Sequence, residues 1–164
     1  MEDNYPSQLW DFQLKKEIKP FIDEMYPPQN RWDIYMNVLG TETLYEEIDN
    51  KNIPSYQEIR KQYPDKTSLK LKIYLFKDID EDNMNEELEK IYRLIQLFRE
   101  KGIQKYSMNI FYYEERMMEE KGRDIKVGAE FLEYCTHRIS VTDEDAESVR
   151  TPKDLEKYLV EFPK

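Results

Sequence analysis

The segment from Ser68 to Arg138 changes its hydrophobic period twice, and this change limits the possible folds more than any other feature of the chain. Within 68–77 apolar residues occupy every second position, which is typical of a strand with one buried face: Leu69, Leu71, Ile73 and Leu75. Within 84–101 the spacing becomes three and four, which predicts a helix with one apolar stripe: Leu88, Ile91, Tyr92, Ile95 and Phe98. Alternation returns near residue 105, so the sequence predicts the order strand, helix, strand.

The ends of helix 84–101 carry residues that favour helix capping. Asp82 or Asn83 is expected at the N-cap, and Glu86 follows Asn83 by three residues, as in a capping box. Gly102 stands where a left-handed residue closes a helix.

Two further strands are predicted at 105–115 and 124–138, joined by a charged turn at 114–123. The second of them places four apolar residues on one face, with Gly128 as a candidate bulge: Ile125, Val127, Ala129 and Phe131. We expect these strands to form an antiparallel hairpin covered by helix 84–101, because neither sheet nor helix can bury its apolar side alone.

The N-terminal part of the chain predicts a helix followed by a strand. Residues 6–25 have helical spacing, but Pro20 predicts a kink or two short helices. Alternation over 31–39 indicates a strand. Residues 41–54 fit either a short helix or the second strand of a hairpin.

Two further helices are predicted from capping signals. Ser55 and Glu58 form the pattern of a capping box, which indicates a helix over 56–63. Residues 141–148 are acidic and fit a loop or a single turn. A last helix is expected from Thr151, followed by a proline at its first position and with four apolar residues on one side: Leu155, Tyr158, Leu159 and Phe162.

The predicted fold is α+β, with a mainly antiparallel sheet of three to five strands packed by helix 84–101 and with extra N- and C-terminal helices. This order is compatible with a ferredoxin-like arrangement. At 164 residues, without internal repeats or low-complexity linkers, residues 1–164 are expected to form a single domain.

The net charge of −10 limits the partners that the chain is expected to bind. Nucleic-acid binding depends on basic residues that neutralise phosphates, so we expect no nucleic acid, and adsorption to anionic lipid is disfavoured for the same reason. No apolar run is long enough to span a membrane. A complete chain is expected in the cytoplasm, whereas removal of an N-terminal anchor would imply an extracytoplasmic location. A basic protein is the partner that the charge favours.

Few residues offer a cofactor or catalytic motif. Four glycines and no phosphate-binding loop argue against dinucleotide and P-loop sites. Cys135 is the one cysteine, which excludes an internal disulfide and a thiolate zinc cluster. Cys135 and His137 are expected on the same side of a strand, where a buried thiol and a strand-end histidine are the simpler interpretation than a nucleophile and its base.

An acidic segment at 78–89 has the ligand spacing of a calcium loop. Counted from the first aspartate, carboxylates fall at the positions that an EF-hand loop uses: Asp78, Asp80, Asp82, Glu86 and Glu89. Against calcium, Asn83 replaces the usual glycine, Asn85 stands where a small apolar residue is expected, and the segment follows a strand. The alternative is an acidic helix N-terminus stabilised by the helix dipole.

Four aromatic residues are expected on the second face of the sheet, beside Lys70 and Lys72: Tyr74, Phe76, Phe111 and Tyr113. A single-stranded RNA platform would use such a face, but the net charge opposes it and the glycine-and-aromatic signature of such sheets is absent. Cover by the first or last helix and a partner surface are the two interpretations left open.

These observations favour a non-catalytic protein-interaction domain, such as a small acidic inhibitor or immunity protein that binds a basic protein. The alternative is a calcium-binding or extracytoplasmic sensor domain centred on 78–89. No set of residues indicates an enzyme.

Overall fold

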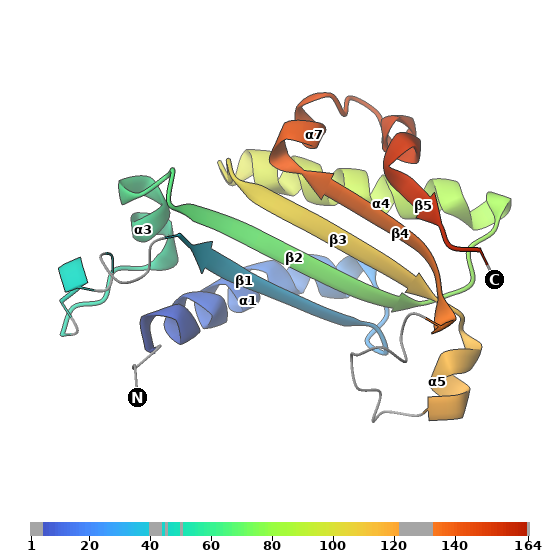
Figure 1. Ribbon diagram of the computed structural model, residues 1–164, viewed down its shortest axis with the longest axis horizontal. Helices are drawn as coiled ribbons and strands as arrows, with labels where there is room; N and C mark the ends of the chain where they lie inside the picture. The colour runs from blue at the N-terminus through green and yellow to red at the C-terminus, as the bar shows by residue number, and fades with distance from the viewer. Residues whose placement is uncertain (1–4, 40–43, 45, 50, 122–132, 164) are drawn as a thin grey trace.

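The computed structural model describes residues 5–39, 44, 46–49, 51–121 and 133–163. Within them the chain forms one five-stranded sheet, whose strands follow chain order from β1 to β5 (Figure 1). The strands are β1 (Arg31–Val38), β2 (Thr67–Phe76), β3 (Tyr106–Tyr113), β4 (Cys135–Thr142) and β5 (Leu159–Glu161). The two long helices, α1 (Tyr5–Met25) and α4 (Glu81–Glu100), both lie behind the sheet in Figure 1. The predicted α+β class is therefore confirmed.

Three of the four strand pairs are antiparallel, and β2 pairs with β3 in parallel. A parallel pair needs a long crossover, which α4 supplies between β2 and β3. Because these two parallel strands are direct neighbours, a ferredoxin-like split β-α-β arrangement is not confirmed.

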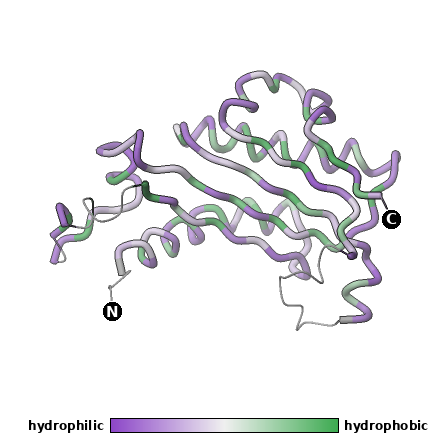
Figure 2. Tube along the Cα trace, in the orientation of Figure 1, coloured by the Kyte–Doolittle hydropathy of each residue, from purple (hydrophilic) through white to green (hydrophobic). Residues whose placement is uncertain are grey.

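The core lies between the sheet and the two long helices. Every second residue of each central strand faces this layer, and the alternation is visible along the strands in Figure 2. The stripe predicted on helix 84–101 is buried there, except that Tyr92 is only partly buried: Leu88, Ile91, Ile95 and Phe98. The helix α1 contributes Trp10, Leu14, Ile18 and Ile22 to the same layer.

The helix α4 begins three residues before the predicted start. Asp80, in extended conformation, is the N-cap, and its side chain accepts a hydrogen bond from the Asn83 backbone. The Asn83 side chain accepts in return from the Asp80 backbone, so asparagine completes the box in place of a glutamate. The prediction of Asp82 or Asn83 as N-cap was therefore wrong. At the other end, Gly102 has a φ of +65°, which confirms the left-handed residue after the helix.

The hairpin prediction is confirmed for the pairing of its strands and wrong in their extent. Strands β3 and β4 pair antiparallel, but β4 runs to Thr142 and so includes residues expected in a loop. The expected strand residues 124–132, with Gly128, lie outside the described residues. The predicted charged turn contains a short helix, α5 (Arg116–Lys121), because Met117 provides it with a buried anchor.

The flanking elements agree in part with the sequence. Residues Tyr5–Met25 form one helix, α1, with Pro20 inside it, so the alternative of two short helices was wrong. The helix α3 (Tyr56–Gln62) has the capping box of Ser55 and Glu58 that was predicted. In the ambiguous segment 41–54, Leu44, Glu46 and Glu47 are helical.

The C-terminal segment differs from the single predicted helix. A short helix, α7 (Asp143–Glu147), follows β4, and a 3-10 helix, η2 (Pro152–Tyr158), follows it. Leu159–Glu161 then pairs with His137–Ile139 as β5. An edge strand has unpaired backbone groups, and this pairing satisfies part of the edge of β4.

Among the helices of the described residues, none has both the length and the apolar character that crossing a membrane requires.

Candidate functional site

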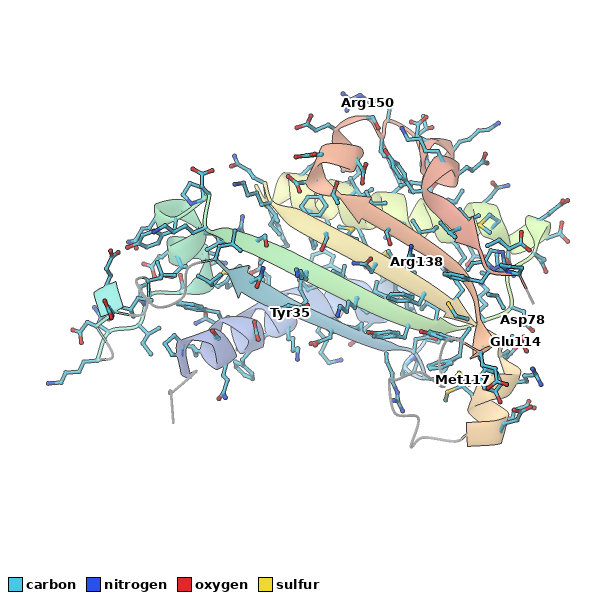
Figure 3. The ribbon with its side chains drawn as sticks, viewed as in Figure 1. Tyr35, Asp78, Glu114, Met117, Arg138 and Arg150 are labelled. Atoms are coloured by element: carbon cyan, nitrogen blue, oxygen red, sulfur yellow. The ribbon has the colours of Figure 1, made fainter. Side chains whose placement is uncertain are left out.

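The sheet face opposite α1 and α4 is the candidate interaction surface, and we call it the open face. Cross-strand partners share a face, and one such row runs across four strands: Tyr74, Phe111, Arg138 and Val160. A view onto this side shows Tyr35 over β1 and Arg138 over β4 (Figure 3). Among the described residues, no helix covers the middle of this face (Figure 1).

The four predicted partner-surface aromatics lie together on this side of the sheet, but two of them are buried. Tyr74 stacks on Phe111, with ring centroids 5.3 Å apart and planes 9° from parallel. Tyr74 also stacks at 6.4 Å on Tyr113, which lies 5.8 Å from Phe76. Phe76 and Tyr113 are buried, whereas Tyr74 and Phe111 are partly exposed.

The buried pair is covered by α5, a helix that the sequence did not predict. Met117 is buried against Phe76, Tyr113 and Cys135, and Met118 packs beside it. A covering helix was one of the two interpretations for this face, but it was expected from the first or last helix. The open face therefore begins at Tyr74 and Phe111 and extends away from α5.

Basic side chains that form no ion pair among the described residues lie near the partly exposed aromatics. Lys72 lies over the ring of Tyr35 at 5.7 Å, and Arg138 over Phe162 at 5.9 Å. Within the described part of the chain, Lys70, Lys72 and Arg138 form no ion pair.

The guanidinium of Arg138 also has an unsatisfied donor. Its Nε is buried and has no hydrogen-bond partner among the described residues. An unpaired buried donor costs free energy.

The predicted calcium ligands are divided among other interactions. Asp80 caps α4, Asp78 accepts a hydrogen bond from the Glu115 backbone at 3.2 Å, and Glu86 pairs with Lys90 at 3.0 Å. Asp82 lies in the first turn of α4 and Glu89 is exposed on the same helix. Within the described ranges, no three acidic, histidine or cysteine side chains are placed to share a metal ion. Calcium binding stays a hypothesis. Equal melting temperatures of the protein in calcium and in chelator would contradict this hypothesis.

Cys135 and His137 lie on opposite faces of β4, contrary to the sequence expectation. The register shifts between Tyr112 and Tyr113, so that Tyr113 pairs with Cys135 and Tyr112 with His137. Successive residues of β3 point to opposite faces, and the irregularity at Thr136 therefore separates the thiol from the imidazole. Burial also raises the pKa of the Cys135 thiol, which disfavours the reactive thiolate.

A buried charged cluster around Glu87 was missed by the sequence analysis. The Glu87 side chain is 1% exposed, and its carboxylate lies 2.9 Å from Lys77 Nζ and 3.1 Å from Lys90 Nζ. The Tyr112 hydroxyl donates to it at 3.3 Å. Among 35 acidic residues none stood out, but Glu87 lies four residues before Ile91 and so falls on the apolar stripe of α4.

The Glu87 cluster forms one wall of a cavity of about 740 Å³ beside the N-terminal half of α4. Tyr26 also lines this cavity, and its buried hydroxyl has no hydrogen-bond partner among the described residues. Two lysines already neutralise Glu87, so the cluster is best explained as a structural ion-pair network.

Comparison of the chain with protein-family models, with curated proteins and with solved structures gives no match.

Proposed function

We propose that the protein is a non-catalytic interaction domain that binds another protein through its open face. The observation that carries this proposal is the partly exposed Tyr74–Phe111 stack, flanked by Lys72 and Arg138, which form no ion pair among the described residues. Aromatic and arginine side chains are enriched at protein interfaces, because they bury much area and retain a polar group.

The local charge determines which partner fits this face. The net charge of −10 favours a basic partner for the molecule as a whole. The open face itself carries Lys70, Lys72 and Arg138, while the carboxylate of Asp33 on β1 is paired with Lys15 at 2.7 Å. A partner segment with carboxylates therefore complements the contact, and its acidic groups can pair with Lys72 and Arg138.

Affinity capture with matched charge variants tests this proposal. The face variant is K70E/K72E, and the control is K16E/K153E, which changes the net charge equally at two exposed positions. We expect one protein to be captured by wild type and control and reduced by about tenfold or more with the face variant. Equal capture by both variants, or no specific capture by wild type, would contradict the proposal.

A second measurement locates the contact. Cross-linking of the purified complex should join an acidic segment of the captured protein to β2 or β3 residues of the open face. Cross-links confined to α1 or α7 would instead indicate the basic partner that the net charge favours, bound at another surface.

A further inference from the structure

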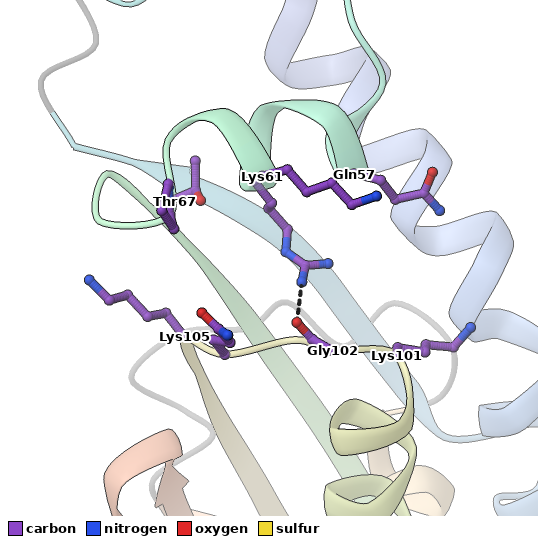
Figure 4. A pocket seen from close by; sticks show the side chains of 9 residues that line it. Gln57, Lys61, Thr67, Lys101, Gly102 and Lys105 are labelled. Atoms are coloured by element: carbon purple, nitrogen blue, oxygen red, sulfur yellow. Dashed lines mark hydrogen bonds between the residues drawn. The ribbon is translucent and has the colours of Figure 1, made fainter.

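A basic cavity of about 620 Å³ lies between α3 and the connection from α4 to β3 (Figure 4). Four cationic side chains line it and no acidic side chain does: Arg60, Lys61, Lys101 and Lys105. Arg60 and Lys61 come from α3, whereas Lys101 and Lys105 come from the connection between α4 and β3 (Figure 4). The cavity is therefore locally basic, although the chain carries a net charge of −10.

Two of the four cations have acidic partners, and both partners lie outside the cavity lining. Lys101 pairs with Glu17 at 2.6 Å, and Lys105 pairs with Asp65 at 3.1 Å. The Asp65 carboxylate is 93% exposed, so this second pair is weak. The charges of the cavity are therefore only partly neutralised from outside.

The two cations of α3 lack an acidic partner within ion-pair distance. Lys61 is exposed and makes no ion pair among the described residues. The guanidinium of Arg60 donates to the Gly102 carbonyl at 3.0 Å, which is a neutral acceptor. Burial lowers the pKa of Arg60, although the charge of Glu17 acts in the opposite direction.

Helix ends explain part of this arrangement. Both α3 and α4 end beside the cavity, and cations are favoured near the C-terminal end of a helix dipole. The helix dipole places cations at the end of each helix separately. It does not explain why cations from two elements line one cavity that has no acidic side chain. A bound anion would reduce the repulsion among them.

We propose that this cavity binds a small phosphate-bearing polyanion. Lysine ammonium groups and the guanidinium of Arg60 can donate hydrogen bonds to phosphate oxygens in addition to their charge. Gln57 and Thr67, which also line the cavity, add neutral polar groups. The volume lies in the range of small-molecule sites, so an anion with more than one phosphate fits. The site is separate from the open face, and it does not depend on the proposed function.

Calorimetric titration of pyrophosphate into the full chain at low ionic strength tests the proposal, with sodium chloride of equal ionic strength as the reference. We expect saturable binding at one site. The variants K61Q and K61Q/K105Q should weaken it by about fivefold or more, whereas K153Q removes the same charge at an exposed residue of η2 and should leave it unchanged.

Absence of saturable binding, or equal weakening by K153Q, would overturn the proposal, because the effect would then follow the net charge alone. Lys61 is exposed, and melting of each variant without ligand checks that the fold is retained. Inorganic phosphate serves as the second probe: binding of pyrophosphate more tightly than phosphate supports a polyanion, and equal affinity contradicts it.

Discussion

Glu87 is the most deeply buried acidic residue among the described residues. Its carboxylate is buried on α4 and neutralised by two lysines. Lys77 directly follows β2, and Lys90 lies one turn further along α4. The same lysines bury much of their stems, so the three groups hold the start of α4 to the sheet. A buried ion pair stabilises a fold little in net terms, but loss of one partner is costly.

We predict that Glu87→Gln lowers the free energy of unfolding by about 3 kcal/mol, the low end of the cost for breaking a buried pair. The low end applies because Lys77 is 37% exposed and can be rehydrated. The matched control is Glu86→Gln on the same helix, whose side chain is 63% exposed and whose loss should change stability little. Urea unfolding of both variants measures the difference, and equal effects would show that burial of Glu87 is not what matters.

At the scale of single elements, the cap of α4 distinguishes the observed start of the helix from the predicted one. We predict that Asp80→Ala costs about 1 kcal/mol, the usual cost of removing an N-cap side chain. Asp82→Ala removes a first-turn charge without a capping bond and should cost less. Thermal unfolding of the two variants tests this order, and a larger effect at Asp82 would support the sequence prediction instead.

The helix α5 gives a second element-scale prediction, because a single residue anchors it. Met117 is buried on the same side of the sheet as the open face, where it covers Phe76 and Tyr113. We predict that Met117→Ala destabilises the protein by about 2 kcal/mol or more, as expected for truncation of a buried methionine. Met118→Ala, at a partly buried position, is the control and should cost less. A negligible effect of Met117→Ala in chemical unfolding would mean that α5 does not stabilise this end of the sheet.

Sequence patterns predicted the elements whose apolar residues repeat over several turns or strand positions. The helix α4 and strands β1, β2 and β3 have such repeats, and they lie close to their predicted places. The helix α5 was missed because Met117 and Met118 stand in a charged segment too short to show a period. The strand β5 was missed because Leu159 continues the helical spacing of Leu155 and Tyr158, and only pairing with β4 makes it extended.

The candidate sites depended even more on tertiary structure. The sequence placed Tyr74 and Phe111 on one face, since strand alternation is a local property. It did not reveal that Phe76 and Tyr113 are covered, because the covering residue Met117 belongs to another element. The basic cavity was missed for the same reason, since its cations come from two separate segments.

At the scale of the whole molecule, the distribution of charge matters more than its sum. The net charge is −10, yet the open face and the cavity beside α3 are both locally basic. Acidic residues concentrate in helices, including the first turns of α4 and α7. Such separation of charge orients an approaching charged partner and makes its association sensitive to salt.

The last prediction concerns stability at high pH, which buried tyrosines should limit. Burial raises the pKa of Tyr26 and Tyr112, and the nearby charge of Glu87 raises both further. In the unfolded chain the pKa of tyrosine is about 10. A group whose folded pKa is raised contributes stability that is fully present below its unfolded pKa and is lost as the pH rises, so urea midpoints should fall above about pH 10.

Tyr26→Phe is the informative variant, because the hydroxyl it removes has no hydrogen-bond partner in the described structure. Its stability near neutral pH should change little, while its decline above about pH 10 should be shallower than that of wild type. An equally steep decline in this variant would show that burial of Tyr26 does not contribute to alkaline unfolding.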